Sequence, residues 1–320
     1  MVNRGKFCVA ALAVAIGAAI GTASAADFTP VVTGVDQPKG VTTDASGNLF
    51  IAAQGTPVGG GAVYESLAPG YGAKTRLAPS LIGNPNGIAV DQQGNVFITD
   101  AFDLTVKEIP AATGYTIFTT IASGFAGPVG IAIDANGNLF VADQNANTVY
   151  ELKPSNYANK IAIHGGAFFF RPSGVAVDPQ GNLFVSEEGN PGFIAEVFAA
   201  GGYQSVSLSP TLSPQPLSIA VDAQDNVFST YGNGTLDEVQ APVFGFPHHI
   251  ATDFGVAFAV AVDGHGHIFV GDVVPGAIEE IGGTPPPPVP ALAPGGLALL
   301  ALLMGGAGWW GLRRRRARLG

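Results

Sequence analysis

The sequence predicts an all-β fold in which six repeated sheets form a closed ring, a six-bladed β-propeller. Three observations carry this prediction. A segment of the type Pro-x-Gly-Val-Ala-Val-Asp recurs six times, and its aspartates are 41 to 47 residues apart. A phenylalanine stands six residues after each of these aspartates. Glycine and proline, with 45 and 24 occurrences, supply turn residues along the whole chain.

Each repeat contains two short β-rich runs joined by an Asp-x-x-Gly turn, which predicts a β-hairpin. The aspartates of the six turns are Asp44, Asp91, Asp134, Asp178, Asp222 and Asp263. Asp-x-x-Gly is typical of a type I turn, in which the aspartate side chain accepts backbone N–H groups of the turn. In the fifth repeat Asp225 replaces the glycine, and aspartate tolerates the left-handed conformation better than most residues. We therefore interpret the six aspartates as turn caps rather than as calcium ligands.

The phenylalanines occupy the same place in every repeat and predict a ring of contacts between neighbouring sheets. They are Phe50, Phe97, Phe140, Phe184, Phe228 and Phe269. Each is expected to contribute about 1.5–3 kcal/mol through burial.

The sixth repeat lacks a fourth strand, although a propeller blade requires four. Its strands are expected near 258–262, 268–270 and 277–281, after which the chain enters a run of prolines. The segment 28–34 precedes Pro38 in the same way as 119–124 precedes Pro128. We expect residues 28–34 to complete the last blade, so that the closed ring leaves few exposed sheet edges.

The repeat pattern, which is clearest in residues 128–152, closely resembles the NHL repeat. The resemblance covers about 28–284 and implies an NHL-like six-bladed propeller. It implies little about activity, because propellers carry out many different functions.

Both ends of the chain have the composition of targeting segments. Residues 1–25 have the basic start, apolar core and Ala-Ser-Ala cleavage site of a signal peptide. The propeller is expected at 26–284, followed by a proline-rich linker at 285–291. Residues 292–312 contain no charge and are long enough for a transmembrane helix, and the basic tail 313–320 is expected to stay in the cytoplasm.

The linker also resembles a known C-terminal sorting signal. Val289, Pro290, Ala291 and Leu292, followed by an apolar run and terminal arginines, are similar to the IPTL-CTERM and PEP-CTERM signals. This resemblance implies a sorting protease as a partner. It also implies export from a Gram-negative cell to the periplasm, the outer surface or the exterior, with transient or permanent anchoring in the cytoplasmic membrane through residues 292–312.

The charge of the central region argues against nucleic acid as a partner. All 24 acidic residues but only seven lysines and arginines lie between the two basic ends, which gives this region a formal charge of −17. A phosphate backbone would be repelled by such a surface.

Candidate binding residues are the acidic side chains that end the second strand of four repeats. These are Asp100, Asp143, Glu187 and Asp272, with Ala53 and Thr230 expected at this position in repeats one and five. Carboxylates at matching positions can gather a divalent cation. They can equally accept backbone N–H groups where loops begin.

Six-bladed propellers related to NHL proteins include gluconolactonase-type hydrolases and antibiotic-inactivating or amidating lyases. In lactonase-like proteins, metal ligands come partly from the middle residue of Pro-x-Gly. The six residues here are Lys39, Asn86, Val129, Ser173, Leu217 and Phe258, of which Asn86 alone fits. The five histidines are scattered, whereas a catalytic zinc site needs three converging ligands.

Two functions follow from these observations. The favoured one is a non-enzymatic exported propeller that binds a carbohydrate, peptide or protein of the cell envelope or extracellular matrix, with no cofactor. The alternative is a metal-dependent lyase or lactone hydrolase at one channel mouth, in which Asn86 acts with Asp100, Asp143 or Glu187 around a divalent cation.

Overall fold

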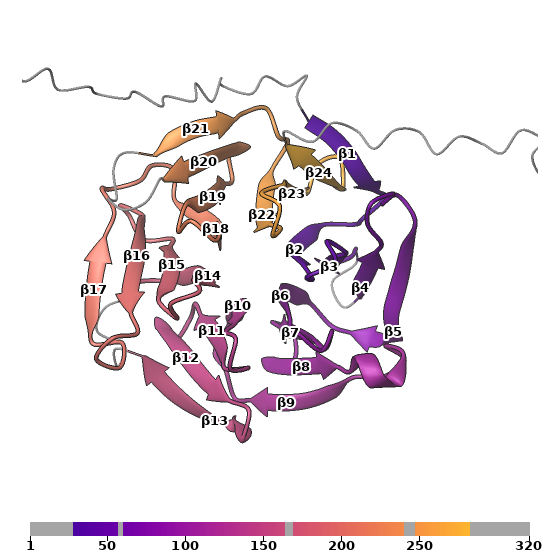
Figure 1. Ribbon diagram of the computed structural model, residues 1–320, viewed down its shortest axis with the longest axis horizontal. Helices are drawn as coiled ribbons and strands as arrows, with labels where there is room; N and C mark the ends of the chain where they lie inside the picture. Colours follow the sequence, from indigo (N-terminus) through magenta and orange to yellow (C-terminus); the bar gives the residue numbers. More distant parts are fainter. Residues whose placement is uncertain (1–27, 57–59, 164–168, 240–246, 282–320) are drawn as a thin grey trace, which may run out of the picture. The chain divides into compact units, whose positions relative to one another are not determined.

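The computed structural model describes residues 28–56, 60–163, 169–239 and 247–281. These residues form six four-stranded antiparallel sheets arranged in a ring (Figure 1). The expected signal peptide, sorting motif, transmembrane helix and basic tail lie outside the described residues. Among the described residues no helix has the length and apolar character needed to cross a membrane.

Each of blades 1 to 5 contains four strands that are consecutive in the sequence. Blade 1 consists of β2 (Pro38–Thr43), β3 (Leu49–Ala53), β4 (Gly61–Ser66) and β5 (Lys74–Ile82). Blade 2 consists of β6 (Pro85–Val90), β7 (Val96–Asp100), β8 (Thr105–Ile109) and β9 (Thr119–Ser123), with a 3-10 turn at Ala111–Thr113. Blade 3 consists of β10 (Pro128–Ile133), β11 (Leu139–Asp143), β12 (Thr148–Lys153) and β13 (Asn156–Ile163).

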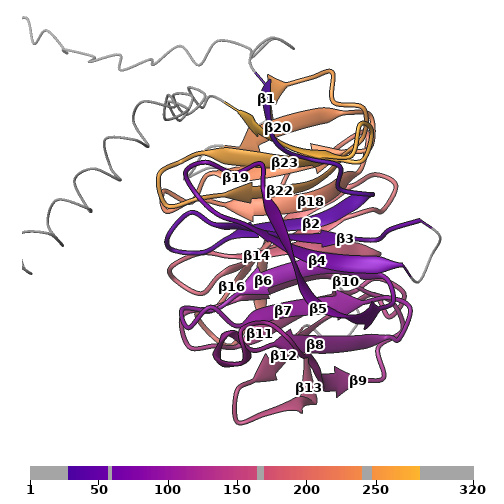
Figure 2. The same cartoon turned by 90° about the vertical axis from the view of Figure 1, so that its right-hand side faces the viewer.

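The remaining two consecutive blades follow the same order. Blade 4 consists of β14 (Pro172–Val177), β15 (Leu183–Glu187), β16 (Phe193–Phe198) and β17 (Ser205–Leu208). Blade 5 consists of β18 (Pro216–Val221), β19 (Val227–Tyr231), β20 (Thr235–Val239) and β21 (His248–Ala251). The ring is seen edge-on in Figure 2, with the outer strand β5 of blade 1 facing the viewer.

Blade 6 combines the two ends of the described chain. Its strands are β22 (Ala257–Val262), β23 (Ile268–Asp272), β24 (Ala277–Ile281) and β1 (Phe28–Thr33). β1 pairs antiparallel with β24, from Phe28 opposite Ile281 to Thr33 opposite Ala277. The predicted closure of the ring by the N-terminal strand is confirmed.

The Asp-x-x-Gly turns have the predicted geometry in all six blades. In blade 1 the Asp44 Oδ1 accepts the backbone N–H groups of Ser46 at 2.8 Å and Asn48 at 2.9 Å, and Oδ2 accepts the Asn48 side-chain amide at 2.8 Å. The turn glycine adopts a positive φ in five blades, and Asp225 adopts φ 64° in blade 5. The aspartates therefore cap turns, as the sequence indicated.

The repeated phenylalanines are buried between neighbouring blades, as predicted, and four of them contact a tyrosine of the next blade. The ring pairs are Tyr71 on Phe269, Tyr115 on Phe50, Tyr157 on Phe97 and Tyr203 on Phe140, with centroids 5.6–6.1 Å apart. Each tyrosine hydroxyl also donates to the carbonyl of the turn glycine in its own blade, at 3.0 to 3.3 Å. One side chain thus fixes a turn and joins two blades.

The inner strands β2, β6, β10, β14, β18 and β22 surround a central channel. The glycine of Pro-x-Gly is required there because the inner strands approach closely. A Cβ on Gly40 would lie 2.3 Å from the Asn86 carbonyl oxygen, and one on Gly87 would lie 2.4 Å from that of Val129. The channel therefore narrows at the Pro-x-Gly end.

We predict that β1 is indispensable to the ring. Val32 is fully buried, so Val32→Asp should reduce the free energy of unfolding by about 3 kcal/mol or more. Thr33 is exposed on the same strand, and Thr33→Asp should change stability by no more than about 0.5 kcal/mol. Chemical denaturation of both variants checks this. Equal stability of the Val32→Asp variant and the wild type would contradict closure by β1.

A second prediction concerns Asp225, the one turn position where glycine is replaced. Its positive φ is strained for a residue with a side chain, and burial, followed by the charges of Asp178 and Asp222, raises the pKa of its carboxyl. Asp225→Gly should therefore stabilise the protein by about 1 kcal/mol. The matched change Gly181→Asp in blade 4 should destabilise it, and thermal melts of the two variants that shift in the same direction would refute the argument.

Candidate functional site

The two ends of the central channel differ in size and chemistry. The Pro-x-Gly mouth, at the start of the inner strands, contains a cavity of about 60 Å³ lined by the six middle residues of Pro-x-Gly. The turn mouth, at the Asp-x-x-Gly turns, contains a cavity of about 630 Å³. Between them the channel is lined by aliphatic residues such as Val41, Ile88 and Val175. We call the larger cavity the cup.

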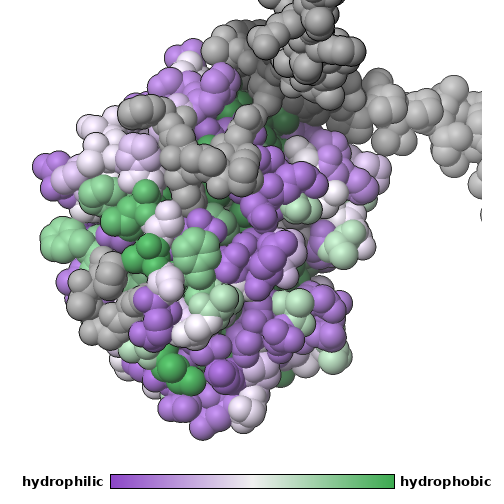
Figure 3. Space-filling view, turned by 60° about the vertical axis from the view of Figure 1, so that its left-hand side comes forward, coloured by the Kyte–Doolittle hydropathy of each residue, from purple (hydrophilic) through white to green (hydrophobic). Residues whose placement is uncertain are grey.

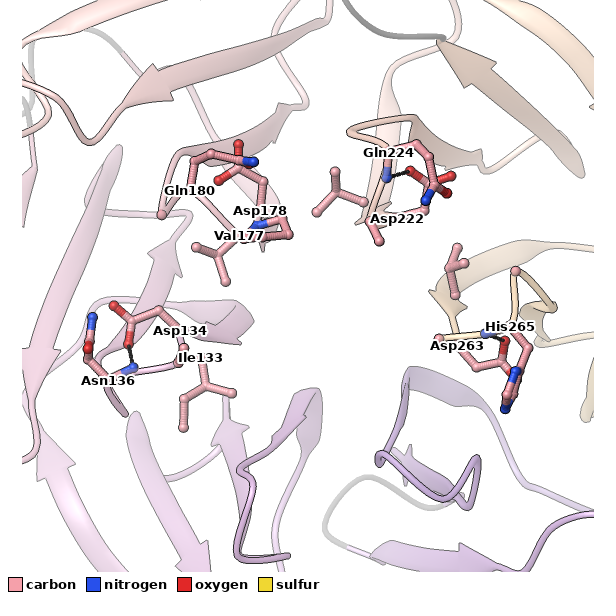
Figure 4. A pocket seen from close by; sticks show the side chains of 18 residues that line it. Ile133, Asp134, Asn136, Val177, Asp178, Gln180, Asp222, Gln224, Asp263 and His265 are labelled. Atoms are coloured by element: carbon pink, nitrogen blue, oxygen red, sulfur yellow. Dashed lines mark hydrogen bonds between the residues drawn. The ribbon is translucent and has the colours of Figure 1, made fainter.

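The turns of blades 3 to 6 form the cup. Ile133 and Val177, with Val221 and Val262, form an aliphatic floor, and Figure 4 shows Ile133 and Val177 pointing toward the centre. The walls carry the third residue of each turn, which is exposed; these residues are Asn136, Gln180, Gln224 and His265. Four carboxylates, Asp134, Asp178, Asp222 and Asp263, lie at the edge of the floor.

These carboxylates are already engaged in their own turns. The Asp134 Oδ1 accepts the N–H groups of Asn136 and Asn138 at 2.9 and 2.8 Å, and its Oδ2 accepts the Asn138 amide at 2.7 Å. At Asp263, burial alone would raise the pKa, but N–H groups of His267 and His265 and the His267 ring hold it below its usual value. Their hydrogen bonds thus hold the carboxylates in place.

The wall amides are free to bind a ligand. Within the described part of the chain, the side-chain amides of Asn136 and Gln224 have no hydrogen-bond partner. The Gln180 side-chain nitrogen, in the amide orientation that satisfies its neighbours, donates to the Asp178 and Asp225 carboxylates at 3.3 Å each. The Gln180 side-chain oxygen is then free to accept a hydrogen bond. A primary amide offers two donors and an acceptor in one plane. The cup therefore has an apolar floor and a wall of neutral hydrogen-bonding groups.

The four carboxylates predicted as candidate binding residues accept backbone N–H groups of the loops that enter their blades. Asp143 accepts the N–H groups of Ala126 at 2.8 Å and Gly127 at 2.7 Å, both in the loop that enters the same blade. Asp272 accepts those of Gly255 at 2.7 Å and Val256 at 2.8 Å in the same way. Both side chains are nearly inaccessible, with 1% and 2% exposure.

Asp100 and Glu187 hold equivalent loops but differ in their partners. Asp100 accepts N–H groups of Gly83 at 2.9 Å and Asn84 at 3.0 Å, and it forms an ion pair with Lys107. Burial would raise its pKa, but the Lys107 ammonium and the backbone donors lower it below the usual value. Glu187 accepts one N–H, from Phe170 at 3.0 Å, and burial raises its pKa to about 6.

The residues do not fit a divalent cation at the Pro-x-Gly mouth. Asn86 lines this cavity, as the Pro-x-Gly pattern suggested, but none of the four carboxylates does. The mouth instead contains the ammonium group of Lys39, which would repel a second cation. In the four described ranges, no three histidines, aspartates or glutamates are placed to share a metal ion.

The residue of blade 5 that corresponds to the four carboxylates is Tyr231. It pairs with Pro216 in the way that Asp100 pairs with Pro85, so the prediction of Thr230 at this position is wrong. His248 and His249 lie on the outer strand β21, and His249 pairs with Asp237. His265 and His267 lie in the blade-6 turn, where His267 takes the place of the usual asparagine.

The exposed surface shows no single dominant apolar face on the side of blades 4 and 5. Figure 3 views this side and shows apolar residues in small groups among hydrophilic ones. Such scattered apolar residues are normal on soluble proteins. The two mouths, by contrast, contain cavities.

The ring, its central channel and its two mouths define a six-bladed β-propeller. No family model and no curated protein matches the sequence. Among solved structures, a gluconolactonase from Xanthomonas campestris, XC5397, is similar over 79% of this chain and 88% of its own, with 16% identity and a TM-score of 0.66. Virginiamycin B lyase from Staphylococcus aureus is similar over 77% and 80%, with 15% identity and a TM-score of 0.54.

A further match is a structure of the nidogen/laminin complex, with 15% identity, a TM-score of 0.61, and coverage of 71% of this chain and 85% of that one. These similarities show the fold. The matched propellers include enzymes and a protein from a binding complex, so they do not select between the two functions.

We predict a distinctive pH dependence from Glu187. Its pKa is higher in the folded protein than the ordinary value of 4.5, so the folded state binds more protons between pH 4.5 and 6, and stability falls as the pH rises through this window. Glu187→Gln should remove this dependence and raise stability at pH 7 by about 1 kcal/mol. Unfolding free energies measured from pH 4 to 7 check this, with Glu188→Gln, at the partly exposed neighbouring carboxylate that pairs with Arg171, as the control. The prediction would be contradicted if the free energy of unfolding of the wild type rose from pH 4.5 to 6 and the Glu187→Gln variant showed the same profile.

Proposed function

We propose that the protein is an exported, non-enzymatic binding module that takes a neutral carbohydrate of the cell envelope or matrix in the cup. The observation that carries this proposal is the combination of a cavity of about 630 Å³, an aliphatic floor and free amides at equivalent positions of neighbouring blades. Export rests on the expected signal peptide at 1–25 and sorting signal at 289–292.

The wall chemistry favours hydroxyl groups. The Asn136 and Gln224 amides can each donate to one hydroxyl and accept from the next, and the Gln180 oxygen can accept from a third, which matches the adjacent hydroxyls of a sugar ring. The floor of Ile133, Val177, Val221 and Val262 can cover the C–H face of the ring. A few polar groups on a mostly apolar surface are typical of small-molecule sites.

The charge of the cup favours a neutral ligand. Four aspartates surround the floor, and the described domain has few cations to offset them. A negative potential raises the local concentration of cations and repels anions. Sugars with carboxylate or sulfate groups are therefore expected to bind less well than neutral ones of the same size.

A double variant tests the proposal. Gln180→Ala with Gln224→Ala removes two wall amides, and affinity for neutral gluco-oligosaccharides should fall about tenfold or more, since a lost hydrogen bond costs about 0.5–1.5 kcal/mol. Gln93 holds the same turn position in blade 2 but does not line the cup, so Gln93→Ala is the matched control. Isothermal titration calorimetry gives the affinities.

Three results would overturn the proposal. These are unchanged affinity in the double variant, an equal loss in the Gln93→Ala control, or no saturable binding of any neutral oligosaccharide. Oligogalacturonides serve as the charged comparison, and binding as tight as that of the neutral series would refute the electrostatic argument.

A further inference from the structure

Lys39 differs from the other cations of the described domain. Lys107, Lys153 and Arg171 pair with carboxylates. Lys74, Lys160 and Arg76 donate to backbone carbonyl groups. In the residues that the structure describes, the Lys39 ammonium has no oxygen partner of either kind. It lies 3.5 Å from the centre of the Phe258 ring, which offers only the weaker attraction of a cation to an aromatic face.

This unpaired cation lies in a small cavity with two kinds of neighbour. Lys39, Asn86 and Ser173 are the polar lining residues at the second position of Pro-x-Gly, whereas Val129, Leu217 and Phe258 are apolar. Leu217 and Phe258 belong to the neighbouring blades 5 and 6. Phe258 also contacts Lys39 of blade 1, where the ring closes between blades 6 and 1. The mouth thus combines one charge with an adjoining apolar wall.

Three loops on this side of the ring also carry exposed apolar side chains. In each blade the first two strands are antiparallel, so the end of the second strand lies beside the start of the first, at the Pro-x-Gly mouth. The loops that follow β7 and β23 and the loop that precedes β14 therefore lie on this side of the ring. These loops carry Phe102, Phe170 and Val274, which are 58–64% exposed. Exposed large apolar side chains around a cavity are typical of a ligand site.

We propose that the Pro-x-Gly mouth is a second ligand site, in which the Lys39 ammonium binds the carboxylate of a small organic acid whose apolar part lies against Phe258 and Leu217. The cavity of about 60 Å³ holds roughly the volume of two water molecules, enough for a carboxylate but not for a larger acidic group. The body of the ligand must then extend out of the cavity, beside Phe258 and Leu217.

The charge of the domain selects a monoanion. One ammonium group can neutralise one carboxylate, and the strongly acidic protein around it repels multivalent anions. Burial lowers the pKa of Lys39, as expected for a cation that no protein oxygen stabilises. A bound carboxylate should raise this pKa again, which gives a second observable.

The test uses phenylacetate, its neutral analogue phenylacetamide, and acetate, each titrated into the purified propeller. Two-dimensional NMR of the Lys39 side chain and the Asn86 amide reports binding. Phenylacetate should give saturable shifts, and phenylacetamide should bind about tenfold more weakly because it lacks the charge. Acetate should also bind more weakly than phenylacetate because it lacks the apolar part.

Lys39→Met keeps the apolar stem and removes the charge, and it should reduce affinity for phenylacetate at least about tenfold. Lys74→Met is the matched control, since Lys74 also lies near an aromatic ring, 5.7 Å from the centre of Tyr64, but outside the mouth. The melting temperature of each variant shows whether it is folded. If Lys39→Met does not fold, the comparison of acid with amide on the wild-type protein decides.

Equal binding of phenylacetate and phenylacetamide would overturn this proposal, as would an undiminished affinity in a folded Lys39→Met variant or the absence of saturable shifts with phenylacetate. The Gln180→Ala, Gln224→Ala double variant should bind phenylacetate normally, because the cup residues lie at the other mouth. The two sites are therefore tested independently.

Discussion

The pairing of β1 with β24 is the interaction on which the rest of the structure depends. Five blades are made from consecutive strands, but the sixth is complete only when Phe28 to Thr33 pairs with Ala277 to Ile281. Without this pairing the edge of β24 would be open, and only the direct contacts between blades 6 and 1 would hold the ring closed. Both candidate sites are formed by residues from several blades, so neither exists in a single repeat.

Both contacts of blade 5 differ from the other four, and its contact with blade 4 lies beside the cup. Four junctions have a tyrosine of one blade packed on the repeated phenylalanine of its neighbour, but the sequence between β20 and β21 contains no tyrosine. Asp225 is strained here. Ser229 stands where the other five blades have Ile or Val, and the buried hydroxyl of the next residue, Thr230, has no hydrogen-bond partner among the described residues.

These departures from the repeat reduce stability locally. A buried hydroxyl without a hydrogen bond costs about 1–3 kcal/mol, and a residue with a side chain in the left-handed region costs about 1 kcal/mol. Gln180 and Gln224, from the turns on either side of this junction, are both cup residues. Residues that break a local pattern are common at functional sites, because function and stability place different demands on the same positions.

The repeat made most of the fold predictable, because its signals are local and occur six times. The aspartate turns and buried phenylalanines follow from the spacing of residues within one hairpin, and the missing strand of the sixth repeat identified residues 28–34 as its replacement. Sequence reasoning missed the tyrosine contacts, although Tyr71, Tyr115, Tyr157 and Tyr203 recur 42 to 46 residues apart, an interval within the range of the main repeat. The cup was missed for a different reason: its wall residues occupy one turn position whose identity changes from blade to blade. Which turns surround a cavity depends on the assembled ring.

The candidate carboxylates show why residue type alone could not locate the site. A buried carboxylate at a strand end suits either a cation or backbone N–H donors, and only the three-dimensional partners decide between them. Asp143 and Asp272 each accept N–H groups from an incoming loop, so their charge is used to hold the fold. The charged groups that line the two ends of the channel have opposite signs, with four turn carboxylates at one mouth and Lys39 at the other. Because an aliphatic segment separates the mouths, each end can select its own class of ligand, a neutral hydroxylated one at the turns and a small carboxylate at Lys39.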